Sequence, residues 1–284
     1  MTTTILAAVS GGTASAGAVE IGCRLAKRFD AHIEGFHVMP DPRQFIMAAG
    51  FDVPITADLV DRLIEDSKQV AARAKAGFEQ TAARNGLPLG NAGGKNAPSA
   101  RWCEKTGYAP MAVAERGRFF DLVVLGRSDR VVDQPHTDAI EQTLIRSGRP
   151  VLLAPAKIPA ALGDAVAVGW DGSASAVHAL AGTLKLLSTA RRVVVITVSK
   201  TNGAADGTAV VDYLSWHGIA AQLRQVQSAQ GVGAGELLLA TAREEDADLL
   251  VMGGYGHAPW REVLFGGATR QIVANSLLPV LLAH

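Results

Sequence analysis

The sequence predicts an α/β protein of two tandem domains, each a doubly wound parallel sheet of five strands. The first observation is that short apolar segments, typical of buried strands, occur twice in the same order, so one unit is repeated. The second is that helical patterns separate these segments, as parallel strands require. The third is the composition, 48% hydrophobic but only 5% aromatic, which fits cores of Val, Leu, Ile and Ala. The repeated pairs are ILAAVSG at 5–11 and VAVGWDG at 166–172, DLVVLG at 121–126 and DLLVMG at 248–253, and RPVLLAP at 149–155 and LPVLLA at 278–283.

The first copy is expected to form a domain over residues 1–157. Its strands end in loops rich in Ser, Gly and Pro, and its helices interleave apolar and charged side chains at helical spacing. Residues 44–60 contain the apolar patch Phe45-Ile46-Met47. They have no counterpart in the second copy and are interpreted as an insertion. In chain order we predict a strand at 5–9, a helix at 16–28, a strand at 32–39, a helix at 57–85, a loop at 86–98, a helix at 108–118, a strand at 122–125, a helix at 138–147 and a strand at 151–154.

The second copy, residues 163–284, follows the short linker KIPAALG at 157–163. Its strands are short and apolar on both faces, which indicates a parallel sheet covered by helices on both sides. A doubly wound sheet of this kind binds ligands at the carboxyl ends of its strands. The predicted elements are strands at 165–169, 192–197, 220–225, 249–252 and 280–283, and helices at 175–188, 208–217, 233–245 and 269–276.

Charge and composition argue against several classes of partner. The chain has 27 basic and 27 acidic residues and a pI of about 7.1, so nothing attracts it electrostatically to nucleic acid or to an anionic membrane. No apolar run reaches the roughly 18 residues of a spanning helix, and the amino terminus lacks a basic signal-peptide region. Cys23 and Cys103 form no metal-binding or redox motif, and Cys23 is expected to be a small buried thiol. We therefore expect a cytoplasmic protein without a metal site.

The second copy contains a glycine-rich segment at the carboxyl end of its fourth strand. It runs from Gly253 and Gly256 to Gly266 and Gly267, at the start of the last helix. Glycines let backbone N–H groups approach phosphate oxygens, and a helix N-terminus adds free donors and a favourable dipole. Asp171, after the first strand, can accept a hydrogen bond from an adenine amino group or a ribose hydroxyl. Together these features predict a nucleotide pocket, although the same glycines could serve only tight turns and close helix–sheet packing.

These residues resemble the universal stress protein family, and the resemblance extends over both copies. It implies an adenine nucleotide alpha hydrolase-like fold, with the glycine segment on the phosphates, Asp171 on the adenine and a backbone group around Val198 adding a base contact. It also implies ATP, ADP or AMP as the ligand, with or without Mg²⁺, and an unknown protein partner. In family members the last strands often pair, which would join 151–154 to 280–283 and pack the two domains as an intramolecular pseudo-dimer. A further homodimer is compatible with the sequence.

The second copy departs from the family pattern at one position. The family usually has Ser or Thr directly after the last glycine of the motif, where the hydroxyl contacts phosphate. This chain has Gly267 there, and its nearest hydroxyl is Thr269. Losing one hydroxyl contact costs about 1 kcal/mol, roughly a factor of five in affinity, while the backbone donors remain.

The first copy lacks the features expected of a nucleotide site. Asp129 replaces the second motif glycine, the later Gly-Gly pair is absent, and Ser10 stands in place of Asp171. An acidic side chain in the phosphate position would repel the ligand. This copy is therefore interpreted as a structural or partner-binding domain, and its insertion could enclose another small, apolar ligand.

Two other functions remain open from the sequence. One is a stress-induced interaction or chaperone-like module that binds no nucleotide, which Gly267 in the hydroxyl position favours. The other is an adenylating enzyme, because SGGTAS at 10–15 resembles a pyrophosphate loop, although Ala14 replaces the acidic residue of that motif. No nucleophile–base pair or paired carboxylate is visible, so we assign no catalytic residue, and at most slow hydrolysis of bound ATP is expected.

Overall fold

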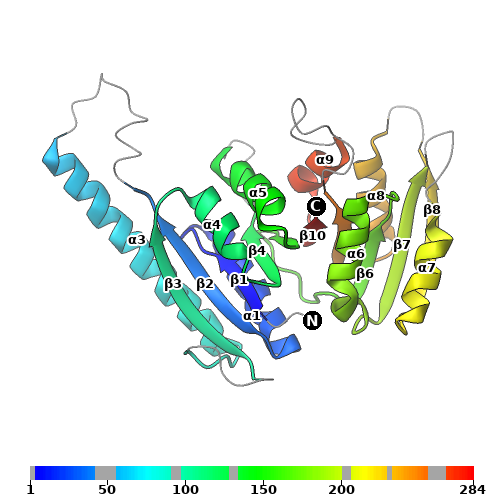
Figure 1. Cartoon of the computed structure of the whole chain (residues 1–284), viewed down its shortest axis with the longest axis horizontal. Coiled ribbons are helices and arrows are strands. Elements are labelled where there is room, and N and C mark those ends of the chain that lie inside the picture. Colours follow the sequence, from blue (N-terminus) through cyan, green and yellow to red (C-terminus); the bar gives the residue numbers. More distant parts are fainter. Residues whose placement is uncertain are drawn as a thin grey trace. The chain divides into compact units, whose positions relative to one another are not determined.

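The computed structural model describes residues 4–41, 56–90, 97–127, 134–199, 206–228, 232–254 and 267–284. The chain forms two compact units, Thr2–Ser147 and Gly148–His284. Each unit is built on a mostly parallel sheet with helices against it, which confirms the predicted α/β fold (Figure 1). Within the described residues, no helix combines the length and apolar character that crossing a membrane requires.

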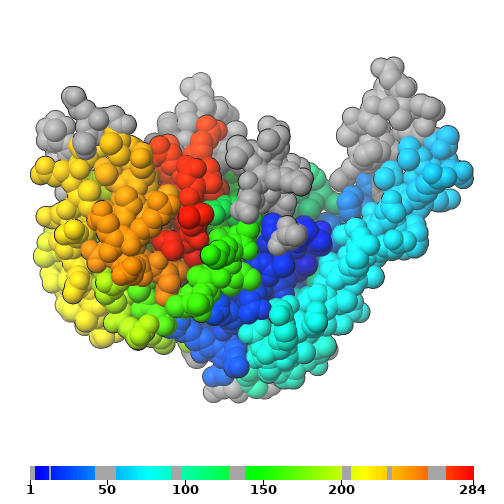
Figure 2. Space-filling view, turned by 180° about the vertical axis from the view of Figure 1, so that it is seen from behind, coloured from blue at the N-terminus to red at the C-terminus, as the bar shows by residue number. Residues whose placement is uncertain are grey.

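The unit Thr2–Ser147 has four parallel strands in the order β3-β2-β1-β4. Helices α1 and α3 contact each other and strands of this sheet, and α4 and α5 form a second pair. Figure 2 shows α3 in cyan as a long ridge on this unit. The elements are β1 (Thr4–Ala8), α1 (Thr13–Phe29), β2 (His32–Met39), α3 (Ala57–Arg84), β3 (Ser99–Thr106), α4 (Ala109–Gly117), β4 (Leu122–Gly126) and α5 (Gln134–Ser147).

Strand β3 corrects the sequence analysis, which placed no strand in Ser99–Thr106. Its sequence, SARWCEKT, is polar, and its last three residues are exposed. It pairs with β2 over its whole length, from Ser99 opposite His32 to Thr106 opposite Met39. The strand forms because β2 offers it a long row of backbone partners, while its own side chains lack the apolar pattern of a buried strand.

The unit Gly148–His284 has the strand order β5-β10-β9-β6-β7-β8, parallel throughout except for β5, which runs antiparallel to β10. Leu152 pairs with Leu281, so the predicted pairing of 151–154 with 280–283 is confirmed. The elements are β5 (Val151–Ala154), β6 (Ala165–Gly169), α6 (Ala174–Leu187), β7 (Arg192–Ser199), α7 (Gly207–Trp216), β8 (Ala221–Gln227), α8 (Ala234–Glu244), β9 (Leu249–Gly253), α9 (Gly267–Asn275) and β10 (Val280–Ala283).

The repeated Asp-Leu motif ties strands together at their amino ends. Asp121, before β4, accepts hydrogen bonds from the backbone N–H and the hydroxyl of Thr4 at 3.1 and 3.2 Å. Asp248, before β9, accepts from the backbone N–H groups of Gly163 and Ala165 at 2.6 and 3.2 Å. Both aspartates satisfy backbone donors at the start of a neighbouring strand, so the repeat conserves a structural role rather than a catalytic one.

Candidate functional site

The candidate site of the unit Gly148–His284 lies where its sheet changes winding direction. From β6 the chain winds through β7 to β8 on one side, while β9 and β10 lie on the other. The loops that follow β6 and β9 therefore leave the sheet side by side at its carboxyl edge, the usual ligand position in doubly wound sheets. Asp171 follows β6, and Gly253 is the last residue of β9.

Asp171 belongs to the turn that begins helix α6. Its Oδ1 accepts a hydrogen bond from the backbone N–H of Ser173 at 3.0 Å, and the residue is exposed. Ser173 caps the helix, because its hydroxyl oxygen accepts from the N–H of Ala176 at 3.2 Å. This local network fixes the loop and leaves the Asp171 carboxylate accessible at the carboxyl end of β6.

Val198 lies near the end of β7, beyond the part of that strand that pairs with β6. The backbone N–H of Trp170 donates to the carbonyl of Ile196 at 2.9 Å, so the polar groups of Ile196 face β6. In a parallel pair every second residue faces the same neighbour, so the N–H and C=O of Val198 face that side too. Strand β6 has already ended at Gly169, opposite Ile196. The Val198 backbone therefore faces the space beside the Asp171 loop.

Gly253 is required by packing, whatever its role toward a ligand. A Cβ at this position would lie 2.5 Å from the Ala176 backbone nitrogen and 2.7 Å from the Ser175 hydroxyl. The other unit repeats the restriction at Gly126, where a Cβ would lie 2.0 Å from the carbonyl oxygen of Ala14. In both units the glycine lets the first helix begin directly against the end of a central strand.

The last helix begins on the same edge of the sheet. A helix that connects parallel β9 to β10 must start near the carboxyl end of β9, so the first turn of α9 lies at this edge. Gly267 is exposed there, and a Cβ on it would meet no atom of the described residues within 4 Å. Thr269 is buried, only 5% exposed. Gly256 and Gly266, also predicted to contact phosphate, lie outside the described residues.

The structure thus places Asp171, Val198 and Gly253 at the carboxyl ends of the adjacent strands β6, β7 and β9. Sequence reasoning missed Thr197 at the end of β7. This residue is 1% exposed, and within the described chain its hydroxyl oxygen has no hydrogen-bond partner. A lone Thr in an apolar strand gives no signal in the sequence, because its surroundings depend on the fold.

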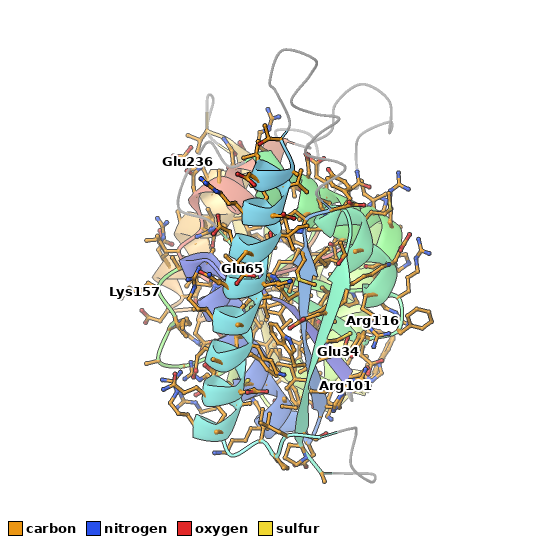
Figure 3. All side chains as sticks on the ribbon, turned by 90° about the vertical axis from the view of Figure 1, so that its left-hand side faces the viewer. Glu34, Glu65, Arg101, Arg116, Lys157 and Glu236 are labelled. Carbon is orange, nitrogen blue, oxygen red and sulfur yellow. The ribbon has the colours of Figure 1, made fainter. Side chains whose placement is uncertain are left out.

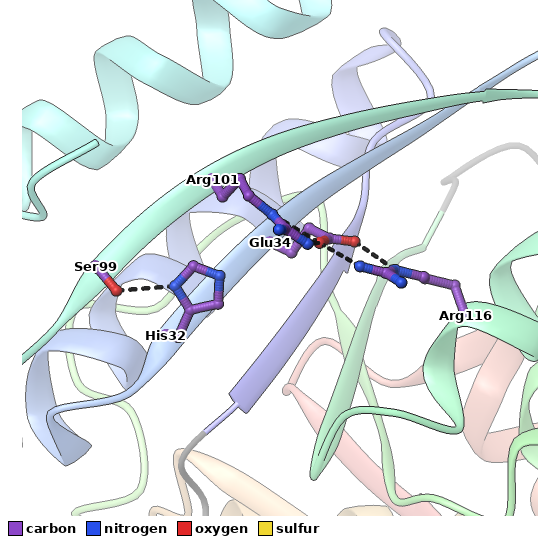
Figure 4. Close-up of polar contacts among 5 residues, drawn as sticks. All are labelled: His32, Glu34, Ser99, Arg101 and Arg116. Atoms are coloured by element: carbon purple, nitrogen blue, oxygen red, sulfur yellow. Dashed lines mark hydrogen bonds and ion pairs between the residues drawn. The ribbon is translucent and has the colours of Figure 1, made fainter. Parts of the chain in front are cut away.

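The unit Thr2–Ser147 contains a buried ion cluster. Glu34 of β2 is fully buried and accepts hydrogen bonds from Arg116 of α4 at 2.7 Å and from Arg101 of β3 (Figures 3 and 4). Burial alone would raise the pKa of Glu34, but the hydrogen bonds and positive charges of Arg116 and Arg101 outweigh it, so its pKa lies below the ordinary value. The cluster fastens β2, β3 and α4 to one another.

Other titratable groups of this unit also have shifted pKa values, among them His32 and Cys23. His32 shares a hydrogen bond of 2.8 Å with Ser99, and burial followed by the charge of Arg101 lowers its pKa (Figure 4). Burial raises the pKa of the Cys23 thiol to about 12, and its expected burial is confirmed. A buried, protonated thiol is a poor nucleophile. Among the described residues no group of three or more His, Cys, Asp or Glu could hold a metal ion.

Comparison with known proteins identifies the second unit. Residues 164–284 match the model of the Universal stress protein family. A universal stress protein from Synechocystis sp. is 28% identical over 191 residues, a match that covers 64% of each protein. Residues 164–284 therefore belong to the universal stress protein family. Because the chain spans less than two thirds of that relative, any activity of the whole protein remains a matter for proposal.

Solved structures extend the likeness of fold to the whole chain. A universal stress protein from Archaeoglobus fulgidus matches with a TM-score of 0.74 at 17% identity, covering 99% of this chain and 97% of its own. A protein of unknown function from Pseudomonas aeruginosa matches with a TM-score of 0.52 at 14% identity, covering 99% of this chain and 92% of its own. At these identities the matches show a shared fold.

Proposed function

We propose that residues 163–284 form a domain that binds one adenine nucleotide, ATP, ADP or AMP, and that its loaded state is recognised by a protein partner in a stress response. The carrying observation is that Asp171 and the Val198 backbone converge beside the first turn of α9 at the switch point of the sheet. An accessible carboxylate and an open strand end suit the adenine, and a helix N-terminus suits the phosphates. The match of residues 164–284 to the Universal stress protein family supports the same reading.

One observation favours the second candidate, a partner-binding module without nucleotide. Gly253 is explained completely by its contact with the start of α6, and Gly126 repeats that contact in the unit that lacks the nucleotide motif. The first glycine of the motif therefore does not by itself argue for phosphate. The two functions differ in whether Asp171 and the α9 N-terminus contact a nucleotide.

Calorimetric titration of the whole protein with ATP and with AMP, each with magnesium, tests the proposal. We expect saturable binding, weakened about fivefold to tenfold by Asp171→Ala, because one hydrogen bond to the base is lost. Asp212→Ala is the matched control, since Asp212 is an exposed aspartate on α7 of the same unit. Its affinity should equal that of the unaltered protein.

Two results would contradict the proposal, and the first of them would favour the partner-binding module. One is the absence of binding heat and of thermal stabilisation at millimolar nucleotide. The other is binding that Asp171→Ala leaves unchanged, which would separate the nucleotide from the loop after β6.

A further inference from the structure

A cavity of about 410 Å³ lies in the unit Thr2–Ser147, at the carboxyl ends of β1, β2 and β4. In the order β3-β2-β1-β4 the switch point falls between β1 and β4, so the cavity occupies the preferred ligand position of this sheet. Its volume lies within the range of small-molecule sites, about 300–1,000 Å³. The unit that lacks the nucleotide motif therefore keeps a preformed site.

Matching hydrogen bonds show how this cavity corresponds to the candidate nucleotide site. The N–H of Val9 donates to the carbonyl of Phe36 at 2.9 Å, as Trp170 donates to Ile196 in the other unit. One residue later in the chain, Ser10 therefore stands where Asp171 stands. The cavity lies in the same place as the nucleotide site, but its side chains differ in kind.

Apolar side chains form most of the wall. They come from both helical layers and from the strand ends, and include Val9, Phe36, Val70, Val113, Leu125 and Ile140. None of the described lining residues is Lys or Arg, and the exposed Asp66 adds a negative charge. Among the described lining residues no cation would compensate the repulsion that a phosphate or carboxylate meets from Asp66. The lining selects an uncharged, mainly apolar molecule.

The first half of α3 helps to form this wall. Leu63, Ser67 and Val70 line the cavity at helical spacing, and all three are half-buried. The buried residues of α3 begin only at Ala71 and continue through Phe78. Helix α7 lies beside β7 and β8 as α3 lies beside β2 and β3, yet it has 10 residues against the 28 of α3. The additional turns of α3 therefore contribute to the wall of the cavity.

His37 supplies a fixed polar group in this apolar wall. It is 3% exposed, and its Nδ1 lies 2.6 Å from the carbonyl oxygen of Val9. A carbonyl can only accept, so Nδ1 donates to it, and in this tautomer Nε2 is the acceptor. The ring stacks on Trp102 at 6.0 Å between centroids, which restrains its orientation. A ligand with an O–H or N–H group can therefore be recognised by Nε2.

We propose that the unit Thr2–Ser147 binds a small, uncharged, mainly apolar molecule with one hydrogen-bond donor, held in this cavity with its donor on His37. This site is separate from the proposed nucleotide site, and its ligand differs in charge and polarity. The two proposals can therefore be tested separately, and the failure of one would not contradict the other.

Calorimetric titration of the whole protein with 1-naphthol near neutral pH tests this proposal. We expect one molecule bound per chain, and about fivefold weaker binding of 1-methoxynaphthalene, which has the same rings but no O–H to donate. His37→Phe should remove the difference between the two probes. Adding AMP should not displace 1-naphthol.

Variants that fill the cavity locate the probe. Ala109 and Ala139 line the cavity from α4 and α5, and neither is fully buried, so Ala109→Phe and Ala139→Phe should each abolish binding while the protein stays folded. Ala72→Phe places the same side chain on an exposed position of α3 outside the cavity and should bind normally. Failure of the unaltered protein to bind 1-naphthol would overturn the proposal. So would binding that both filling variants retain, equal affinity for the two probes, or displacement by AMP.

Discussion

Glu34 shows how one residue can depend on its neighbours for its charge. Its carboxylate is fully buried, whereas Arg101 and Arg116 are 38% and 33% exposed at their side chains. A buried carboxylate is stable in its charged form only if donors replace the lost water, and here two guanidinium groups do so. Burial destabilises the charged form of Glu34. Hydrogen bonds from Arg101 and Arg116, whose side chains remain partly solvated, offset this effect.

Replacing Glu34 with Gln should lower the free energy of unfolding by about 2 kcal/mol at neutral pH, because two arginines lose their charged partner. The pKa of Glu34 lies below its ordinary value of 4.5. The contribution is therefore fully present above pH about 4.5 and lost as pH falls through the pKa of the folded state. Urea unfolding of both proteins between neutral pH and pH about 3 should show the difference shrinking toward acid.

Glu115→Gln is the control for this prediction. Glu115 pairs with Lys105 at 3.5 Å, and both side chains are about half exposed, so its loss should cost less than about 1 kcal/mol at any pH. A difference between Glu34→Gln and the unaltered protein that does not change with pH would contradict the assigned role of charge.

At this scale the predicted site residues stay predictions, and the structure shows where they lie. Asp171 was predicted because it follows an apolar strand, and Val198 because of the family resemblance, and the structure brings the ends of these two strands together. The packing role of Gly253 could not be predicted, since it depends on how α6 approaches β9. The role of His37 Nε2 as an acceptor could not be predicted either, because it depends on the hydrogen bond of Nδ1 to the carbonyl of Val9, 28 residues away.

At the scale of elements, strands that are apolar on both faces were predicted most closely. The polar strand β8 was predicted within two residues, whereas the polar strand β3 was missed. Strands such as β6 and β10 were predicted with their observed bounds, because a parallel strand between two helical layers needs continuous apolar residues. Strand β3 was missed because its residues are polar and its carboxyl end is exposed. Its formation depends on pairing with β2, which no local pattern reveals.

The N-terminus of α9 gives a prediction at this scale. Gly267→Ser should tighten ATP binding about fivefold, because the hydroxyl adds a phosphate contact where a Cβ meets no described neighbour within 4 Å. Gly267→Ala adds the same Cβ without the hydroxyl and should leave the affinity unchanged. Calorimetry on both variants measures the contribution of the hydroxyl. Equal affinities for the two would show that no phosphate lies at this turn.

At the scale of the whole molecule, the two copies share one fold but differ in the side chains and helix lengths at corresponding positions. Corresponding loops after β1 and β6 present Ser10 and Asp171, and corresponding helices α3 and α7 differ in length. The apolar repeats predicted the shared frame because both cores must be buried alike. They could not predict the cavity, whose wall combines residues from distant parts of the unit.

The strand β5 gives a prediction about the boundary between the units. The sequence divides the domains at 157–163, whereas the structure groups β5 with β10 in Gly148–His284. A fragment of residues 148–284 keeps the edge of β10 covered by β5 and should associate less in light scattering than a fragment without β5. A fragment of residues 163–284 exposes that apolar edge and should dimerise or aggregate. Identical behaviour of the two fragments would show that β5 does not protect this edge.

The central claim is that nucleotide binds in one copy only, and counting bound ATP tests it most directly. Calorimetry on the whole protein should give one ATP per chain, for the unaltered protein and for Ala139→Phe in the first unit. Gly267→Asp should abolish binding, because it places a carboxylate at the α9 N-terminus, where a Cβ meets no atom of the described residues within 4 Å. Two sites per chain, none, or a site lost in Ala139→Phe and kept in Gly267→Asp would contradict the claim.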